Sequence, residues 1–253
     1  MDYGPFGFIE KYNPNWNMWT GGGEHYSFMN QPKATQHNYA SLANSMKPLL
    51  TERQDLASID HLVESFSDLC EEAVREMWRK KLGLMSGWTA GTGRIFMTVE
   101  RLMRDTVDYT IFWRQLAQMP RLLGSDWRNL SRQELLAPLL SAFYDPSFVD
   151  SVEKSRPWYE WAVQYLEQLE TEQTDPALTE AGMKQVSPKF IPREWMLVEA
   201  YTAAQKEDYK PIHELYAIFQ TPYDDLPGHD RFYRIASSDV LSSPGIAYMT
   251  CSS

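Results

Sequence analysis

Apolar residues recur at intervals of three or four positions through two long stretches of the first hundred residues. In residues 33–50 they are Tyr39, Leu42, Ala43, Met46, Leu49 and Leu50. Residues 55–82 repeat the spacing with Leu56, Ile59, Leu62, Val63, Phe66, Leu69, Cys70, Ala73, Val74, Met77 and Trp78. This period places the apolar side chains on one face of an α-helix. We therefore predict two amphipathic helices, each with that face buried.

The same periodicity predicts further helices at residues 94–119, 131–144, 157–170, 194–205 and 211–219. Ser131 with Glu134 three positions later indicates a capping box, and Pro157 suits the first turn of its helix. The basic run 79–81 followed by Gly83 is typical of a helix C-terminus. Residues 10–28, 86–93, 171–188 and 221–245 are rich in Gly, Pro and polar side chains, so we predict loops, a linker and a tail there. Almost no strand pattern occurs, and the predicted fold class is mostly α.

Amino-acid composition and net charge indicate which classes of partner this chain is not expected to bind. The 253 residues are 43% hydrophobic and 13% aromatic, which is typical of a folded globular protein. The formal net charge of −10 argues against binding to nucleic acid or to anionic lipid. No apolar run is long enough to cross a bilayer, so we expect no membrane insertion.

Residues 2–8 (DYGPFGF) place the carboxylate of Asp2 at a turn constrained by Gly4 and Pro5. Such a carboxylate can hold a magnesium ion against phosphates, or it can simply cap a surface turn. The residues alone leave both readings open.

Other candidate chemistry is sparse. Cys70 falls within a helical pattern and is expected to pack as a small apolar residue, whereas Cys251 is the third residue from the C-terminus, where a thiol is accessible. The five histidines never occur at metal-ligand spacing, and no catalytic triad can be recognised. We therefore identify no catalytic and no cofactor-binding residue within this chain.

Several short motifs occur in a fixed order along the chain. They are residues 2–8 with 12–14 (YNP), 26–32 (YSFMNQP), 79–84 (RKKLGL), 108–110 (DYT), 187–190 (SPKF) with Arg193, 199–200 (EA) and 221–223 (TPY), and the ending Cys251-Ser252-Ser253. Together they resemble the C-terminal part of the selenoprotein O family, protein-kinase-like proteins that transfer AMP. Residues 2–8 are similar to that family's version of the metal-binding Asp-Phe-Gly segment of kinases.

The resemblance implies a partial protein-kinase-like C-lobe followed by a helical C-terminal extension. The N-lobe, its phosphate-contacting Lys and the catalytic-loop Asp and Asn would all lie upstream of Met1, so the N-lobe is missing. We divide the chain into residues 1–50, with the metal-binding Asp segment, the activation-segment-like loop and the first C-lobe helix; residues 51–170, the helical C-lobe and extension; and residues 171–253, a helical region with its tail.

The resemblance also implies an activity, the transfer of AMP from ATP to Ser, Thr or Tyr hydroxyls of proteins. Asp2 would bind Mg²⁺ or Mn²⁺, and Cys251 would be a redox element. In many members that element pairs with a cysteine of the activation segment; here Met18 stands in that place. We expect the chain to be inactive alone, as a fragment or a natural truncation. A mitochondrial location is expected, with the cytoplasm as alternative. The alternative function is a non-catalytic helical module whose Trp- and Tyr-rich faces bind a protein.

Overall fold

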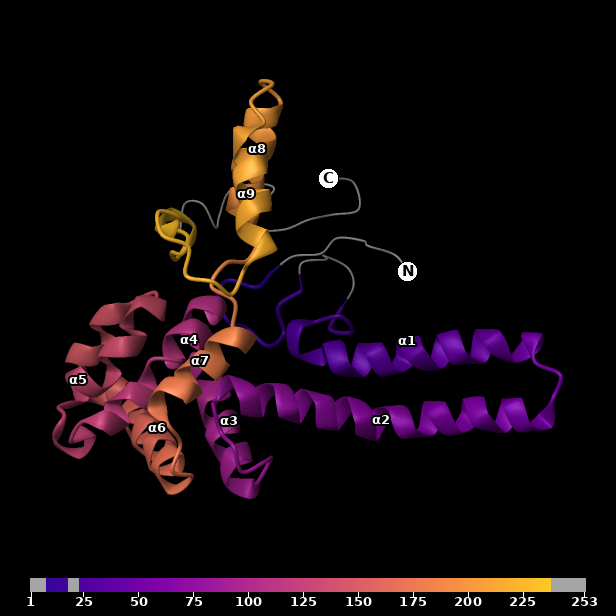
Figure 1. Ribbon diagram of the computed structural model, residues 1–253, viewed down its shortest axis with the longest axis horizontal. Coiled ribbons are helices and arrows are strands. Elements are labelled where there is room, and N and C mark those ends of the chain that lie inside the picture. The colour runs from indigo at the N-terminus through magenta and orange to yellow at the C-terminus, as the bar shows by residue number, and fades with distance from the viewer. Residues whose placement is uncertain (1–7, 18–22, 238–253) are drawn as a thin grey trace.

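The computed structural model describes residues 8–17 and 23–237, and the fold in this part of the chain is mostly helical, as predicted (Figure 1). The α-helices are α1 (Gln31–Met46), α2 (Arg53–Lys81), α3 (Ala90–Met103), α4 (Tyr109–Leu116), α5 (Arg132–Leu136), α6 (Val152–Thr171), α7 (Pro176–Val186), α8 (Glu194–Ala204) and α9 (Lys210–Gln220). Short 3₁₀ turns, among them Met119–Gly124 and Ala137–Ala142, connect several of them. No described helix is long and apolar enough to span a bilayer.

Helices α1 and α2 run antiparallel and project from the rest of the molecule as a two-helix arm (Figure 1). The rings of Tyr39 and Phe66 stack between them, with centroids 4.1 Å apart, and Lys47 Nζ lies 2.6 Å from Asp60 Oδ1 near the tip. The two predicted helices are therefore confirmed.

Their predicted burial is wrong for much of the apolar stripe. Leu42, Leu62 and Leu69 are 59%, 51% and 60% exposed, and Met46 and Leu49 are exposed as well. Each arm helix has only one long neighbour, which covers part of a stripe about 100° wide. A helical wheel places Leu42 and Leu62 on the same side of the hairpin, each about 80–100° away from the direction of the partner helix.

The body of the molecule contains the main hydrophobic core, built by α3 to α7 with the base of α2. Trp161 and Tyr165 of α6 are fully buried and stack at 5.4 Å with nearly parallel rings. Their polar atoms are satisfied, because Trp161 Nε1 donates to the Ile95 carbonyl at 3.1 Å and Tyr165 Oη donates to the Leu82 carbonyl at 2.9 Å. The core is thus aromatic and fixed by specific hydrogen bonds.

Two predicted element boundaries are wrong where local chemistry interrupts a helical pattern. The single helix predicted for residues 94–119 is divided into α3 and α4, because Asp105 takes a positive φ of 57° and Asp108 caps a new helix. The helix predicted for residues 131–144 is α-helical only in α5 and continues as a 3₁₀ turn, Ala137–Ala142.

Two further predictions missed helix starts marked by caps. The linker predicted for residues 171–188 contains α7, whose first N–H groups are capped by the Asp175 carboxylate. Helix α6 begins at Val152 after the cap Ser151, so Pro157 lies inside the helix rather than in its first turn.

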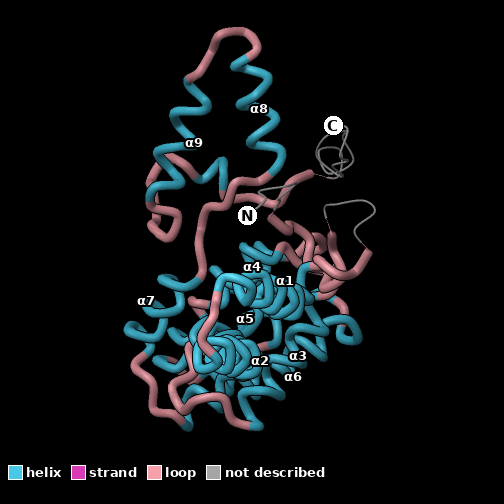
Figure 2. Tube along the Cα trace, turned by 90° about the vertical axis from the view of Figure 1, so that its right-hand side faces the viewer, coloured by secondary structure: helices cyan, strands magenta, loops and turns pink. Residues whose placement is uncertain are grey.

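A second, smaller hydrophobic cluster lies around α8 and α9, which stand apart from the body in Figures 1 and 2. Its buried residues include Phe190, Trp195, Leu215, Ile218 and Phe232. Residues 187–193 connect this unit to the body, and their contacts create the site described next.

Candidate functional site

The two residues singled out for chemistry, Asp2 and Cys251, lie outside the described residues, so their roles stay predictions. Cys70 is a free thiol, partly exposed rather than fully packed, whose Sγ lies 3.9 Å from the Pro32 carbonyl oxygen. Within residues 8–17 and 23–237, no three His, Cys, Asp or Glu side chains are placed to hold a metal ion.

The segment that follows the opening motif lies in the interior of the molecule, beside the turn between α3 and α4. Tyr12 N donates to the Val107 carbonyl at 3.0 Å, Asp105 N donates to the Tyr12 carbonyl at 2.8 Å, and Tyr109 N donates to the Glu10 carbonyl at 2.8 Å. These bonds hold residues 10–12 alongside residues 105–109 in the manner of a short antiparallel ladder.

Residues 142–144 extend this arrangement on the other side. Asp108 N donates to the Ala142 carbonyl at 2.8 Å, and Tyr144 N donates to the Thr106 carbonyl at 3.1 Å. Three segments from distant parts of the chain therefore share one hydrogen-bonded layer.

A buried ionic cluster of Glu10, Asp108 and Arg193 closes this layer. Arg193 Nη1 donates to Asp108 Oδ2 at 2.6 Å and to Glu10 Oε2 at 2.7 Å, and Arg193 Nη2 donates to Asp108 Oδ1 at 3.0 Å. All three side chains are buried. Asp108 Oδ1 also accepts the Ile111 N–H at 2.9 Å and caps α4. One guanidinium thus ties the N-terminal segment, the start of α4 and the start of α8 together.

The pKa values of Glu10 and Arg193 each depend on the charges beside them. Burial raises the pKa of the Glu10 carboxyl, and the adjacent Arg193 charge opposes this shift only in part. Burial by itself would lower the pKa of Arg193, but the hydrogen bonds and negative charges of Asp108 and Glu10 raise it above its ordinary value. Arg193 is therefore held as a cation, and Glu10 is the group in the cluster that is easier to protonate than usual.

Aromatic rings pack the same segment from the side. Tyr12 stacks on Tyr109 with centroids 5.4 Å apart, and Phe28 meets both rings edge-on. Tyr12 Oη donates to Glu100 Oε1 at 2.7 Å, and burial raises the pKa of this phenol. The segment is consequently fixed by backbone, ionic and aromatic contacts at once.

Arg114 makes a second connection between the body and the α8–α9 unit. The buried Arg114 guanidinium donates to the carbonyls of Lys184 and Ser187, at 3.1 and 3.2 Å, and to Asp225 Oδ1 at 3.0 Å. Lys81 Nζ donates to the Val186 carbonyl at 2.9 Å; burial lowers the pKa of this ammonium to about 8. The predicted helix end at residues 79–81 is confirmed, and its last cation also serves this connection.

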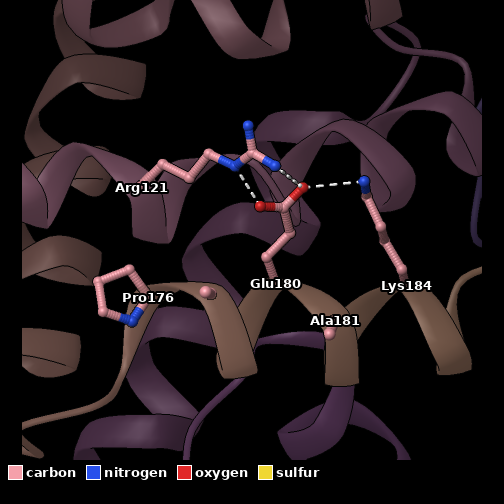
Figure 3. A pocket seen from close by; sticks show the side chains of 6 residues that line it. Arg121, Pro176, Glu180, Ala181 and Lys184 are labelled. Atoms are coloured by element: carbon pink, nitrogen blue, oxygen red, sulfur yellow. Dashed lines mark hydrogen bonds and ion pairs between the residues drawn. The ribbon is translucent and has the colours of Figure 1, made fainter.

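A surface pocket of about 440 Å³ lies between α7 and the 3₁₀ turn Met119–Gly124 (Figure 3). Its buried carboxylate, Glu180, is bound by Arg121 and by Lys184, whose Nζ lies 2.8 Å from Glu180 Oε1. Lys184 Nζ also lies 3.5 Å from Asp225 Oδ2, so both cations that line the pocket are paired with carboxylates.

Asp108 and Arg193 belong to the sequence motifs, but the motifs predicted no role for either residue. Glu10 was not predicted as a site residue. The structure brings these three residues together although Arg193 is 85 residues from Asp108 and 183 from Glu10.

Comparison with known proteins now decides the family. The family model described as "Protein adenylyltransferase SelO" matches residues 1–220. The chain belongs to the SelO family. Glu10, Asp108 and Arg193 all lie within the matched range, whereas Cys251 lies beyond it.

Curated relatives agree with this assignment. The chain is 32% identical over 255 residues to the protein nucleotidyltransferase YdiU of Flavobacterium johnsoniae, and 28% and 29% identical to those of Aromatoleum aromaticum and Rhodopirellula baltica. Each alignment covers 100% of this chain and 46–47% of the relative. This SelO-family chain therefore spans about half the length of the curated relatives it matches.

Proposed function

We propose that this chain is the kinase-like C-terminal portion of a protein adenylyltransferase that transfers AMP from ATP to Ser, Thr or Tyr hydroxyls of proteins. The observation that carries the proposal is the SelO match over residues 1–220, within which the segment following Asp2 is anchored by a buried ionic cluster. The names of the curated relatives support a nucleotidyl transfer to protein.

In this reaction the protein hydroxyl oxygen forms a bond to the α-phosphorus of ATP while the bond from that phosphorus to the bridging oxygen breaks. Pyrophosphate leaves and the hydroxyl proton passes to solvent. Such transfers depend on alignment and on charge stabilisation rather than on covalent chemistry by the protein. A divalent ion, Mg²⁺ or Mn²⁺, would supply part of that stabilisation, and Asp2 is the residue we propose as its ligand in this chain.

The part that this chain's described residues would play is positional. Glu10 follows Asp2 by eight residues, and its carboxylate and carbonyl are both bound to the body. Arg193 and Asp108 would hold Glu10 at a fixed place relative to α4. Precise alignment is what a phosphoryl-type transfer needs, because small displacements of a ligand reduce its rate strongly.

We further propose that this stretch does not transfer AMP by itself, because it spans about half the length of its relatives. Titration of the 253-residue chain with ATP and MgCl₂ in a calorimeter should show no submicromolar binding. Submicromolar affinity would contradict this proposal.

The main test uses a longer protein in which the remaining half of a relative precedes this chain. Asp2→Ala should abolish transfer of radiolabelled AMP to protein and the accompanying pyrophosphate release. Asp55→Ala, which removes an exposed carboxylate on the arm, is the matched control and should leave transfer unchanged. Retained transfer in Asp2→Ala would reject the assigned role.

One observation favours the alternative, a non-catalytic interaction module. The two-helix arm exposes Leu42, Leu62 and Leu69 on one side, and exposed apolar patches are typical of protein-binding surfaces. The same longer protein distinguishes the two functions, because an interaction module would release no pyrophosphate. The mitochondrial location and the redox role of Cys251 stay predictions.

A further inference from the structure

A second pocket, of about 450 Å³, lies between the start of α5 and the second turn of α6. Its lining residues are Leu130, Ser131, Arg132, Arg156, Tyr159 and Glu160. Its volume falls within the range of roughly 300–1,000 Å³ found for small-molecule sites. The pocket shares none of its lining with the ionic cluster or with the pocket of Figure 3.

The two arginines in this pocket have no hydrogen-bond or ion-pair partner among residues 8–17 and 23–237. In the described part of the chain, neither Arg132 nor Arg156 makes a hydrogen bond or lies within 4 Å of a carboxylate. Arg132 Nε is buried without any acceptor. It is one of five buried side-chain N or O atoms without a partner in the described residues, and the one that belongs to a charged side chain, for which a bound anion is an explanation.

Other arginines of the described residues also lack a hydrogen bond or ion pair, but Arg53, Arg94, Arg101 and Arg104 are exposed and line neither of the two pockets. Arg121 and Arg128 each bind a carboxylate of another element, and Arg193 binds two. Arg156 even has Glu160 four positions later on the same helix, a spacing at which ion pairs form readily, yet the two do not pair. Arg132 and Arg156 are thus two unpaired guanidinium groups that line one pocket, in a chain with a net charge of −10.

The other residues that line the pocket determine which chemical groups a ligand could place there. The Ser131 hydroxyl already accepts the Glu134 N–H at 3.3 Å, so it is committed to the helix cap. The ring of Tyr159 and the side chain of Leu130 supply apolar wall, and Glu160 is the one carboxylate that lines the pocket. The other nearby charges on α6, Glu153 and Lys154, are exposed and lie outside the lining.

We propose that this pocket binds a phosphate-bearing small molecule, with the phosphate group held by Arg132 and Arg156. Guanidinium groups match phosphate oxygens with two parallel hydrogen bonds, which an ammonium group cannot do. The net charge of the protein repels anions, so any affinity must come from this local pair. The proposal does not rest on the proposed AMP transfer and concerns a different part of the molecule.

The test is calorimetric titration of the 253-residue chain at constant ionic strength with two probes, inorganic phosphate and ADP. Arg132→Gln and Arg156→Gln should each weaken binding of both probes at least tenfold, whereas Glu160→Gln should tighten it about threefold because it removes a repelling charge. Arg53→Gln, which removes an exposed arginine on the arm, is the control and should leave binding within twofold of the original.

The two probes distinguish the source of the phosphate. Tighter binding of ADP that is lost in Tyr159→Ala would assign the site to a nucleotide, and equal binding of the two would assign it to the phosphate group alone; both outcomes support the proposal. No binding of either probe at 10 mM, or an equal loss in Arg53→Gln, would overturn it. Arg156 is exposed, so Arg156→Gln keeps the test decisive if Arg132→Gln fails to fold.

Discussion

The two-helix arm and the helical body have the same apolar periodicity, yet they differ in how far their apolar side chains are buried. In the body, α3, α4 and α6 meet several neighbours, and side chains such as Trp113, Trp161 and Leu169 are buried completely. In the arm, α1 and α2 meet mainly each other, and leucines at equivalent helical positions are more than half exposed.

The difference shows that the repeat of apolar residues specifies a helix and its orientation, whereas burial depends on how many elements surround it. A helix that has a neighbour on one side only buries only part of its apolar stripe. Substitutions in the two regions should therefore have very different effects on the free energy of unfolding, and a substitution at their junction should have an intermediate one.

The largest effect is expected from Arg193→Met, where the start of α8 is bound to the body. Removing the guanidinium leaves the buried carboxylates of Asp108 and Glu10 without a cation, and breaking a buried pair in this way costs about 3–5 kcal/mol. Urea denaturation followed by circular dichroism measures the free energy of unfolding. The same substitution in the arm, Arg53→Met, should change it by less than about 0.5 kcal/mol because Arg53 is exposed.

The loss in Arg193→Met should also shrink as the pH falls. Burial already raises the pKa of Glu10, and without Arg193 that shift grows. A carboxyl whose folded pKa exceeds its unfolded value of about 4.3 contributes stability at low pH, and this contribution is lost as the pH rises through the folded pKa. A loss equal at pH 4.5 and pH 7.5 would show that Glu10 is not a group left unpaired.

An intermediate effect is expected from Gly83→Ala, at the junction of arm and body. Gly83 ends α2 with a φ of +67°, and an added Cβ would lie 2.6 Å from Thr179 Cγ2 and 2.7 Å from Met183 Sδ of α7. Backbone strain of this kind alone costs about 1–3 kcal/mol, and the two contacts would add to it. We expect a lower free energy of unfolding and a displaced α7.

The control for this substitution is Gly182→Ala within α7, where an added Cβ meets nothing within 4 Å. Because alanine is favoured over glycine inside a helix by roughly 0.5–1 kcal/mol, this variant should be slightly more stable. A destabilisation of similar size in both variants would show that α7 responds to any change rather than to the contact at Gly83.

The smallest effect is expected from Leu62→Gln or Leu69→Gln on the exposed side of the arm. Leu and Gln have similar helix propensities and both leucines are more than half exposed, so the free energy of unfolding should change by less than about 0.5 kcal/mol. In the body, removing the side chain of the buried Leu169 (Leu169→Ala) should cost about 2–5 kcal/mol. If the substitutions at Leu69 and Leu169 lowered the free energy of unfolding equally, the arm and the body would not differ in the way described.

Local signals predicted much of the fold. The capping box of Ser131 and Glu134, the helix stop at Gly83 and the helices α8 and α9 are confirmed. Helix α7 was missed although Asp175 followed by Pro176 is a recognised helix start, because its side chains form no clear apolar stripe.

The candidate site was much harder to predict. Asp108 and Arg193 belong to motifs that resemble the family. Their ion pair could not be predicted, because residues 85 positions apart form no periodic pattern that would reveal the contact. The cost of burying Glu10 is visible only once its partner is known.

The cluster that joins residues 10 and 193 also sets an order of events during synthesis. At about 5–20 residues per second, a ribosome needs roughly 10–40 s to add the 183 residues between them. Glu10 lacks its cation throughout that interval and Asp108 lacks it while the last 85 residues are added, so the ionic cluster cannot yet fix residue 10 against α4. The buried ion pairs of Glu10 therefore form only after residue 193 has been added, and proteases or chaperones acting on the nascent chain before then would meet Glu10 without its cation.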